Sequence, residues 1–139
     1  MTLIEWSDNL KVGIPAMDAE HRRLVALTND FLVAAREGTE PARLDKILAE
    51  LIEQTRRHFI EEETLMDRVS YPHLAAHRVE HERLLTEARL LLERFVALDR
   101  GTADFSALTL ETARYLQRWL VDHIVADDKP YRPYLAQLG

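Results

Sequence analysis

Four long segments of the sequence repeat apolar residues every three or four positions, the spacing that places side chains on one face of a helix. The chain has only four glycines and five prolines in 139 residues, and most of them fall between these segments. The pattern predicts four helices, over residues 18–37, 41–67, 73–99 and 104–126. Because short connections favour antiparallel neighbours, we expect an all-α, up-down-up-down four-helix bundle.

The expected ends of these segments follow from capping residues and prolines. Asp18 is a predicted N-cap for the first helix, after an extended arm over residues 1–17. Pro41 suits the first turn of the second helix. Two further prolines, Pro130 and Pro133, are expected to break the short tail over residues 127–139.

The composition indicates a single domain over residues 1–139, because 47% hydrophobic residues are enough for one core. The formal net charge of −6 disfavours nucleic acid and anionic lipid as partners. No apolar run approaches the roughly 18 residues of a membrane span, and the N-terminus lacks the pattern of a signal peptide. We expect a cytoplasmic monomer, and the sequence does not identify a protein partner. Because the chain has no cysteine, only histidines and carboxylates remain to bind a transition metal.

Histidines stand where the helical pattern requires core residues. His21 heads the apolar stripe of the first segment, and His123 ends that of the fourth. The full set on buried faces is His21, His58, Glu62, His77, His81 and His123. Burying an unpaired polar group costs on the order of one to several kcal/mol, so these side chains need shared partners. A metal ion would be such a partner.

A single core histidine is more often paired with a carbonyl or hydroxyl than with a metal. Here, however, His58 and Glu62 are four positions apart, as are His77 and His81, and this spacing stacks two donors on one helix face. Following the chain up and down the bundle also brings all six side chains to the same end. This agreement favours a metal centre over separate core histidines.

A further carboxylate is expected, because five neutral imidazoles and one glutamate do not balance two divalent or trivalent ions in a low-dielectric core. Asp127 and Asp128 follow the fourth helix. Asp127 is at i+4 from His123 and Asp128 is at i+5, where it would reach in from the loosened helix end. Spacing alone does not choose between them.

Taken in order, these motifs resemble those of the hemerythrins, in particular the single-domain bacterial form, over nearly the whole chain. The matching motifs are Trp6-Ser7, Gly13-Ile14, Asp18-x-x-His21, His58-x-x-x-Glu62, His77-x-x-x-His81 and His123-x-x-x-x-Asp128. The resemblance implies the same bundle and a centre of two iron ions, and it selects Asp128 over Asp127.

The resemblance also implies how the two irons would be held. One iron would be bound by His77, His81 and His123. The other would be bound by His21 and His58 and would keep an open position for dioxygen. Glu62, Asp128 and an oxo or hydroxo group would bridge both.

By the same resemblance, an apolar dioxygen pocket would be walled by Leu24, Phe59, Trp119, Leu120 and Ile124. Ordinary core packing explains these residues equally well. As a wall, they would keep water from the site and slow autoxidation. Of three further side chains, Glu20 adds a negative charge beside His21, and His73 is expected at the surface or at a helix cap. Tyr131 is expected either to pack beside Asp128 or to act as a simple lid, as aromatic residues in short tails more often do.

We expect a binding protein rather than an enzyme, which reversibly binds dioxygen for carriage, storage or delivery. Histidines outnumber carboxylates five to two in the implied centre, which disfavours high-valent iron. The same centre would also permit nitric oxide or iron handling, or dioxygen sensing. A di-metal hydrolase is a weaker alternative, because the expected pocket has almost no groups to orient a polar substrate. Histidine phosphotransfer requires one exposed histidine rather than five on buried faces.

Overall fold

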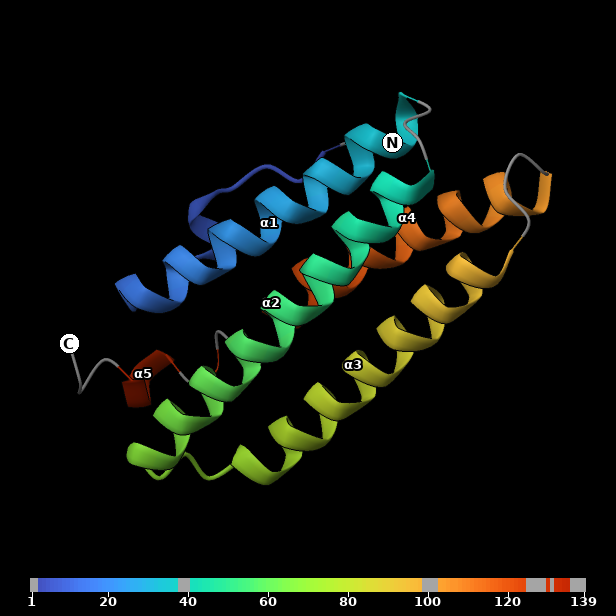
Figure 1. The fold of residues 1–139 in the computed structure, drawn as a ribbon. Helices are drawn as coiled ribbons and strands as arrows, with labels where there is room; N and C mark the ends of the chain where they lie inside the picture. The colour runs from blue at the N-terminus through green and yellow to red at the C-terminus, as the bar shows by residue number, and fades with distance from the viewer. Residues whose placement is uncertain (1–2, 38–40, 99–102, 125–129, 131, 136–139) are drawn as a thin grey trace.

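The computed structural model describes residues 3–37, 41–98, 103–124, 130 and 132–135. Its elements are a 3-10 helix η1 (Asp8–Leu10) and the α-helices α1 (Pro15–Arg36), α2 (Pro41–Arg68), α3 (Leu74–Ala97), α4 (Ala103–His123) and α5 (Arg132–Leu135). No strand occurs among the described residues. The four long helices lie side by side, with α2 against α1 and α3, and α4 against the same two (Figure 1). The predicted all-α four-helix bundle is confirmed.

The start of α1 differs from the prediction, because the helix begins at Pro15 and Asp18 lies within its first turn. Proline is favoured there, since its missing N–H would have no helical partner. The N-cap position is occupied by Ile14. The Asp18 carboxylate instead accepts hydrogen bonds from the backbone N–H groups of Val12, at 2.8 Å, and Gly13, at 3.3 Å. Asp18 therefore fixes the preceding arm rather than capping the helix.

The arm and the tail each contain a short helix that the sequence pattern did not predict. In the arm this is η1, and the arm is also held to α1 by paired hydrogen bonds between the backbone of Ile4 and the side chain of Asn29. In the tail it is α5, which contains Pro133 in its single turn, where proline is tolerated. The α5 helix packs near the end of α2, where the rings of Tyr134 and Tyr71 are 5.0 Å apart.

The turn between α2 and α3 sets the register of these two helices. Ser70 adopts a positive φ of 53°, and the chain then reverses through Tyr71 and Pro72. His73 occupies the N-cap position of α3, is exposed and makes no side-chain capping bond. The prediction of a surface or capping residue is therefore confirmed for His73.

The half of the bundle away from the histidines is filled by aromatic and aliphatic side chains. Phe31, Phe95 and Phe105 form a row across α1, α3 and α4, with ring centroids 6.1 Å and 4.8 Å apart. The buried hydroxyls of Thr28 and Thr55 are satisfied locally, because each donates to the carbonyl one turn earlier. The apolar stripes predicted from the sequence thus point inward.

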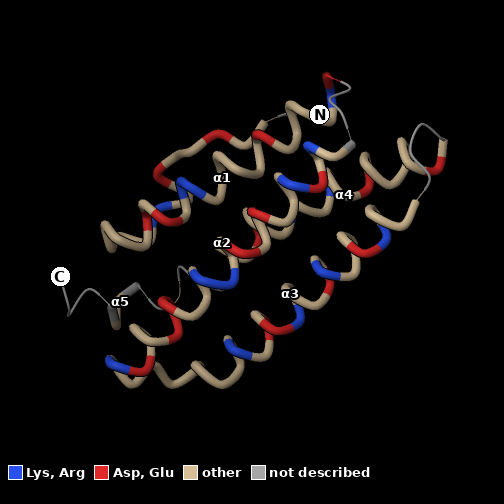
Figure 2. The backbone as a smooth tube through the Cα atoms, in the orientation of Figure 1, with Lys and Arg blue, Asp and Glu red and all other residues tan. Residues whose placement is uncertain are grey.

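Acidic and basic residues are interleaved along the helices (Figure 2). Many of them pair on the surface; for example, Arg83 contacts Glu80 and Glu87, and Arg94 contacts Glu111. Among the described helices, none is long and apolar enough to cross a membrane.

Candidate metal centre

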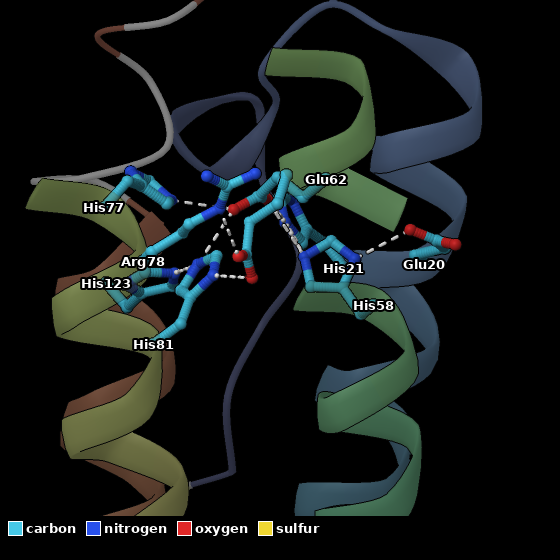
Figure 3. A network of polar contacts seen from close by, with 9 residues as sticks. Glu20, His21, His58, Glu62, His77, Arg78, His81 and His123 are labelled. Atoms are coloured by element: carbon cyan, nitrogen blue, oxygen red, sulfur yellow. Dashed lines mark hydrogen bonds and ion pairs between the residues drawn. The ribbon is translucent and has the colours of Figure 1, made fainter. Parts of the chain in front are cut away.

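Six polar side chains, contributed by all four long helices, converge in the core at one end of the bundle (Figure 3). They are buried, and Glu62 at their centre is fully inaccessible. The six residues are His21 of α1, His58 and Glu62 of α2, His77 and His81 of α3, and His123 of α4. The sequence prediction that these side chains would meet at one end of the core agrees with this arrangement.

The first group of donors lies between α1 and α2 and comprises His21, His58 and Glu62. The Nε2 atoms of His21 and His58 are 2.9 Å apart. One carboxylate oxygen of Glu62, Oε2, lies 3.1 Å from Nε2 of His58 and 3.7 Å from Nε2 of His21. These three atoms therefore face one small volume.

The second group lies between α2, α3 and α4 and comprises Glu62, His77, His81 and His123. The other oxygen of Glu62, Oε1, lies 2.8 Å from Nε2 of His77 and 3.1 Å from Nε2 of His81. Nε2 of His81 is 3.2 Å from Nε2 of His123. Glu62 thus offers one oxygen to each group, the arrangement of a carboxylate that bridges two cation sites.

Burial would raise the pKa of Glu62, but the charge of His58 and the hydrogen bonds from His21, His58 and His77 outweigh burial. Together they hold the pKa of Glu62 well below its usual range. The carboxylate is therefore ionised at neutral pH and available as a metal ligand.

Two of the histidines also contact a carboxylate through their outer nitrogen, Nδ1. His58 Nδ1 lies 2.7 Å from Glu20 on α1, and His81 Nδ1 lies 3.0 Å from Glu63 on α2. The charge of Glu20 was expected beside its sequence neighbour His21, and the structure instead places its carboxylate against His58. Glu63 was not singled out from the sequence.

These contacts allow a test of whether the residues fit a cation. An ionised carboxylate only accepts hydrogen bonds, so Glu20 requires a proton on Nδ1 of His58. The Nε2 lone pair of His58 would then face an anionic oxygen of Glu62 across 3.1 Å. A cation bound between these two atoms would remove this repulsion. The donor set of imidazole and carboxylate, without thiolate, suits a first-row transition metal.

An aromatic and aliphatic wall borders the two groups of donors. Phe59 stacks on His81, with ring centroids 3.7 Å apart and ring planes 2° from parallel, and meets His123 edge to face at 5.3 Å. Trp119 lies 6.2 Å from Phe59 and 6.3 Å from His123. All five residues predicted to wall a pocket, Leu24, Phe59, Trp119, Leu120 and Ile124, are buried. Their role toward dioxygen stays a prediction.

Two surface clefts lead toward the site from opposite sides. A cleft of about 170 Å³ between α1 and α2 is lined in part by Leu24 and His58. Another, of about 290 Å³ between α3 and α4, is lined in part by Trp119 and His123. Each cleft therefore reaches one histidine of a donor group, His58 in the first and His123 in the second.

Three predicted neighbours of the site, Asp127, Asp128 and Tyr131, lie outside the described residues. The assignment of Asp128 as a second bridging ligand consequently stays a prediction. The role of the six converging residues as metal ligands also stays a prediction, because only the positions of their side chains are known.

The fold and the buried donors define a four-helix-bundle protein with a candidate cation site. The hemerythrin HHE cation binding domain matches residues 12–135. The chain belongs to the hemerythrin family, and the family resemblance predicted from the motifs is confirmed.

Individual members of this family are similar to the chain in sequence and in structure. The bacteriohemerythrin of Stenotrophomonas maltophilia is 34% identical over 131 residues, which cover 94% of this chain and 80% of the relative. That of Methylococcus capsulatus is 31% identical over 137 residues, covering 98% of this chain and 99% of the relative. A solved wild-type hemerythrin superimposes with a TM-score of 0.83 at 29% identity, covering 97% of this chain and 99% of that structure.

Proposed function

We propose that the centre binds two iron ions and that, through them, the protein reversibly binds dioxygen for its carriage, storage or delivery. The position of Glu62 carries this proposal, because its two oxygens face two separate groups of histidines. Positive charge on both sides would stabilise this fully buried, ionised carboxylate beyond what the histidine contacts provide. Two cations would supply it.

The described residues divide unequally between the two proposed iron sites. Besides Glu62, the α1–α2 group contains two histidines, His21 and His58, whereas the other group contains three. With Asp128 proposed as a second ligand to both irons, an iron held by His21 and His58 would have one protein ligand fewer than the other. An open coordination position is the requirement for an exogenous ligand such as dioxygen. Ferrous iron, when bound there, would supply the electrons for reaction with dioxygen.

The surrounding side chains support binding over catalysis. Leu24, Phe59, Leu120 and Ile124 carry no polar side-chain atom, and Trp119 offers only an indole N–H. A hydrolase built on the same metals would need polar groups to orient its substrate. The apolar wall would instead limit the access of water, which would protect a bound gas from proton-dependent loss. We therefore propose a binding protein rather than an enzyme.

The proposed centre is tested by metal analysis of protein made in iron-replete cells. We expect about two irons per chain in the wild type and loss of both in Glu62→Ala, because Glu62 serves both sites. The matched control is Thr55→Val, which removes a buried hydroxyl that bonds to the Leu51 carbonyl on the same helix and should retain the iron. One zinc and no iron in the wild type would contradict the proposal.

Dioxygen binding is tested on the anaerobically reduced protein with an oxygen electrode. We expect uptake of about one dioxygen per two irons, followed by release when the gas phase is exchanged for nitrogen. Consumption of dioxygen without release would contradict reversible binding.

A further inference from the structure

Each group of donors contains one histidine whose outer nitrogen contacts a carboxylate that is not among the converging residues. In the first group Glu20 Oε2 lies 2.7 Å from Nδ1 of His58, on the side of the ring away from Glu62 (Figure 3). In the second group Glu63 Oε2 lies 3.0 Å from Nδ1 of His81. Within the described part of the chain, a contact of this kind is therefore present on each side of the centre.

The two carboxylates come from different helices, but each is placed by helix geometry. Glu20 projects from α1 onto a histidine of α2, and Glu63 projects from α2 onto a histidine of α3. Successive helical residues point about 100° apart, so Glu63 faces α3 while Glu62 faces the core. Both are partly shielded, with 27% of the Glu20 side chain and 21% of the Glu63 side chain exposed.

We propose that Glu20 and Glu63 are positioning residues for the two proposed iron sites, which aim Nε2 of His58 and His81 at the metals and make those nitrogens stronger donors. A carboxylate acceptor holds the proton on Nδ1 and leaves the Nε2 lone pair free for a metal. Its negative charge also favours the more positive oxidation state of the bound ion. This inference rests on one part of the proposed function, the binding of iron, and does not require dioxygen binding.

The two sides of the centre are expected to differ in strength. Glu63 also contacts Arg78, whose Nε lies 3.2 Å from Glu63 Oε1, so the arginine offsets part of its charge. Among the described residues, Glu20 has its ion pair with His58 alone. Glu20 should therefore affect its iron site more than Glu63 affects the other.

Variants at position 20 separate the hydrogen bond from the charge. Glu20→Gln retains an oxygen acceptor for His58 but removes the negative charge, whereas Glu20→Ala removes both. The matched control is Glu61→Gln on α2, which removes a charge from the same α1–α2 cleft. Glu61 is exposed, and no hydrogen bond of its side chain to a histidine is found within the described residues.

The first measurement is the affinity for ferrous iron, by anaerobic competition with a chelator. We expect Glu20→Ala to weaken binding by about 10- to 100-fold. The midpoint potential of the iron-loaded protein should also rise in Glu20→Gln, by about 59 mV for each tenfold loss of ferric over ferrous affinity. Glu63→Gln should give a smaller rise and Glu61→Gln almost none. Equal shifts in Glu20→Gln and Glu61→Gln, or wild-type affinity in Glu20→Ala, would overturn the proposal.

The second measurement does not depend on iron or dioxygen. Nitrogen chemical shifts of the histidines in the zinc-loaded protein report which ring nitrogen carries the proton. We expect protonated Nδ1 on His58 in the wild type and in Glu20→Gln, with a perturbed Nδ1 resonance in Glu20→Ala. A resonance unchanged by Glu20→Ala would overturn the positioning role. A protein that fails to bind dioxygen but shows these shifts would refute the proposed function and leave the positioning role intact.

Discussion

The wall residue Leu120 offers a sharp test of whether apolar packing protects the proposed site. Its side chain is 1% exposed and lies one helical turn before His123 on α4. Leu120→Ala removes buried methyl groups and leaves a cavity, which costs about 3 kcal/mol of unfolding free energy, within the usual range of about 2–5. For a chain of 139 residues, the unfolding entropy of about 2.1 cal/mol/K per residue converts this loss to a fall in Tm of about 10 °C.

A matched control separates lost stability from altered access. Leu116 is also 1% exposed on α4 but lies one turn farther from His123. Leu116→Ala should therefore lose a similar amount of stability, measured by thermal and urea unfolding. Only Leu120→Ala should autoxidise faster than the wild type, because its cavity adjoins the site and admits water. The assay follows the visible spectrum of the oxygenated protein over time, together with iron content, which neither change should reduce.

Two outcomes would refute this reasoning. Faster autoxidation in both variants would mean that general loosening of the bundle, rather than access at the wall, controls the rate. Wild-type autoxidation in Leu120→Ala despite the expected loss of stability would mean that Leu120 packs the core without protecting the site.

Three further predictions concern the metal and its ligands. Iron that binds only the folded protein at 100 times its Kd should add about 2.7 kcal/mol per site to the free energy of unfolding, or roughly 9 °C in Tm; equal melting of metal-free and iron-loaded protein would count against a buried site. Because folding depresses the pKa of Glu62, its stabilising contribution is complete above the unfolded pKa of about 4.3 and is lost as the pH falls below it. In urea unfolding of metal-free protein, the stability advantage of wild type over Glu62→Gln should therefore shrink between about pH 5 and pH 3, and a constant difference would contradict it. Asp128→Ala should lose iron, whereas Asp127→Ala should keep it, and the reverse result would reassign the bridging ligand.

The convergence of the six donors was predictable because helical periodicity acts on every turn of a long segment. Once His58 and Glu62 share a face with Leu51, burying the leucine buries the other two as well. Antiparallel connectivity then brings early positions of one helix beside late positions of the next, as with His21 and His58.

Features that depend on a neighbouring helix were not predictable in the same way. Glu20 is next to His21 in the sequence, but its side chain points in another direction and contacts His58. This contact depends on how α1 is rotated against α2. Aspartate is a common N-cap residue, but α1 begins before Asp18, at Pro15. The backbone N–H of Val12 in the arm donates to the Asp18 carboxylate instead. The α5 turn is too short to form by propensity alone, and it packs against α2, where Tyr134 meets Tyr71.

Repeated gas exchange on the reduced, iron-loaded protein tests the reversibility of dioxygen binding most directly. The protein should be nearly colourless under nitrogen, gain a visible charge-transfer band in air and lose it when nitrogen is restored. We predict that this cycle repeats with constant iron content and little loss of amplitude, because the buried wall keeps water from the site. Oxidation in a single irreversible step, with no band that reverses under nitrogen, would contradict reversible dioxygen binding.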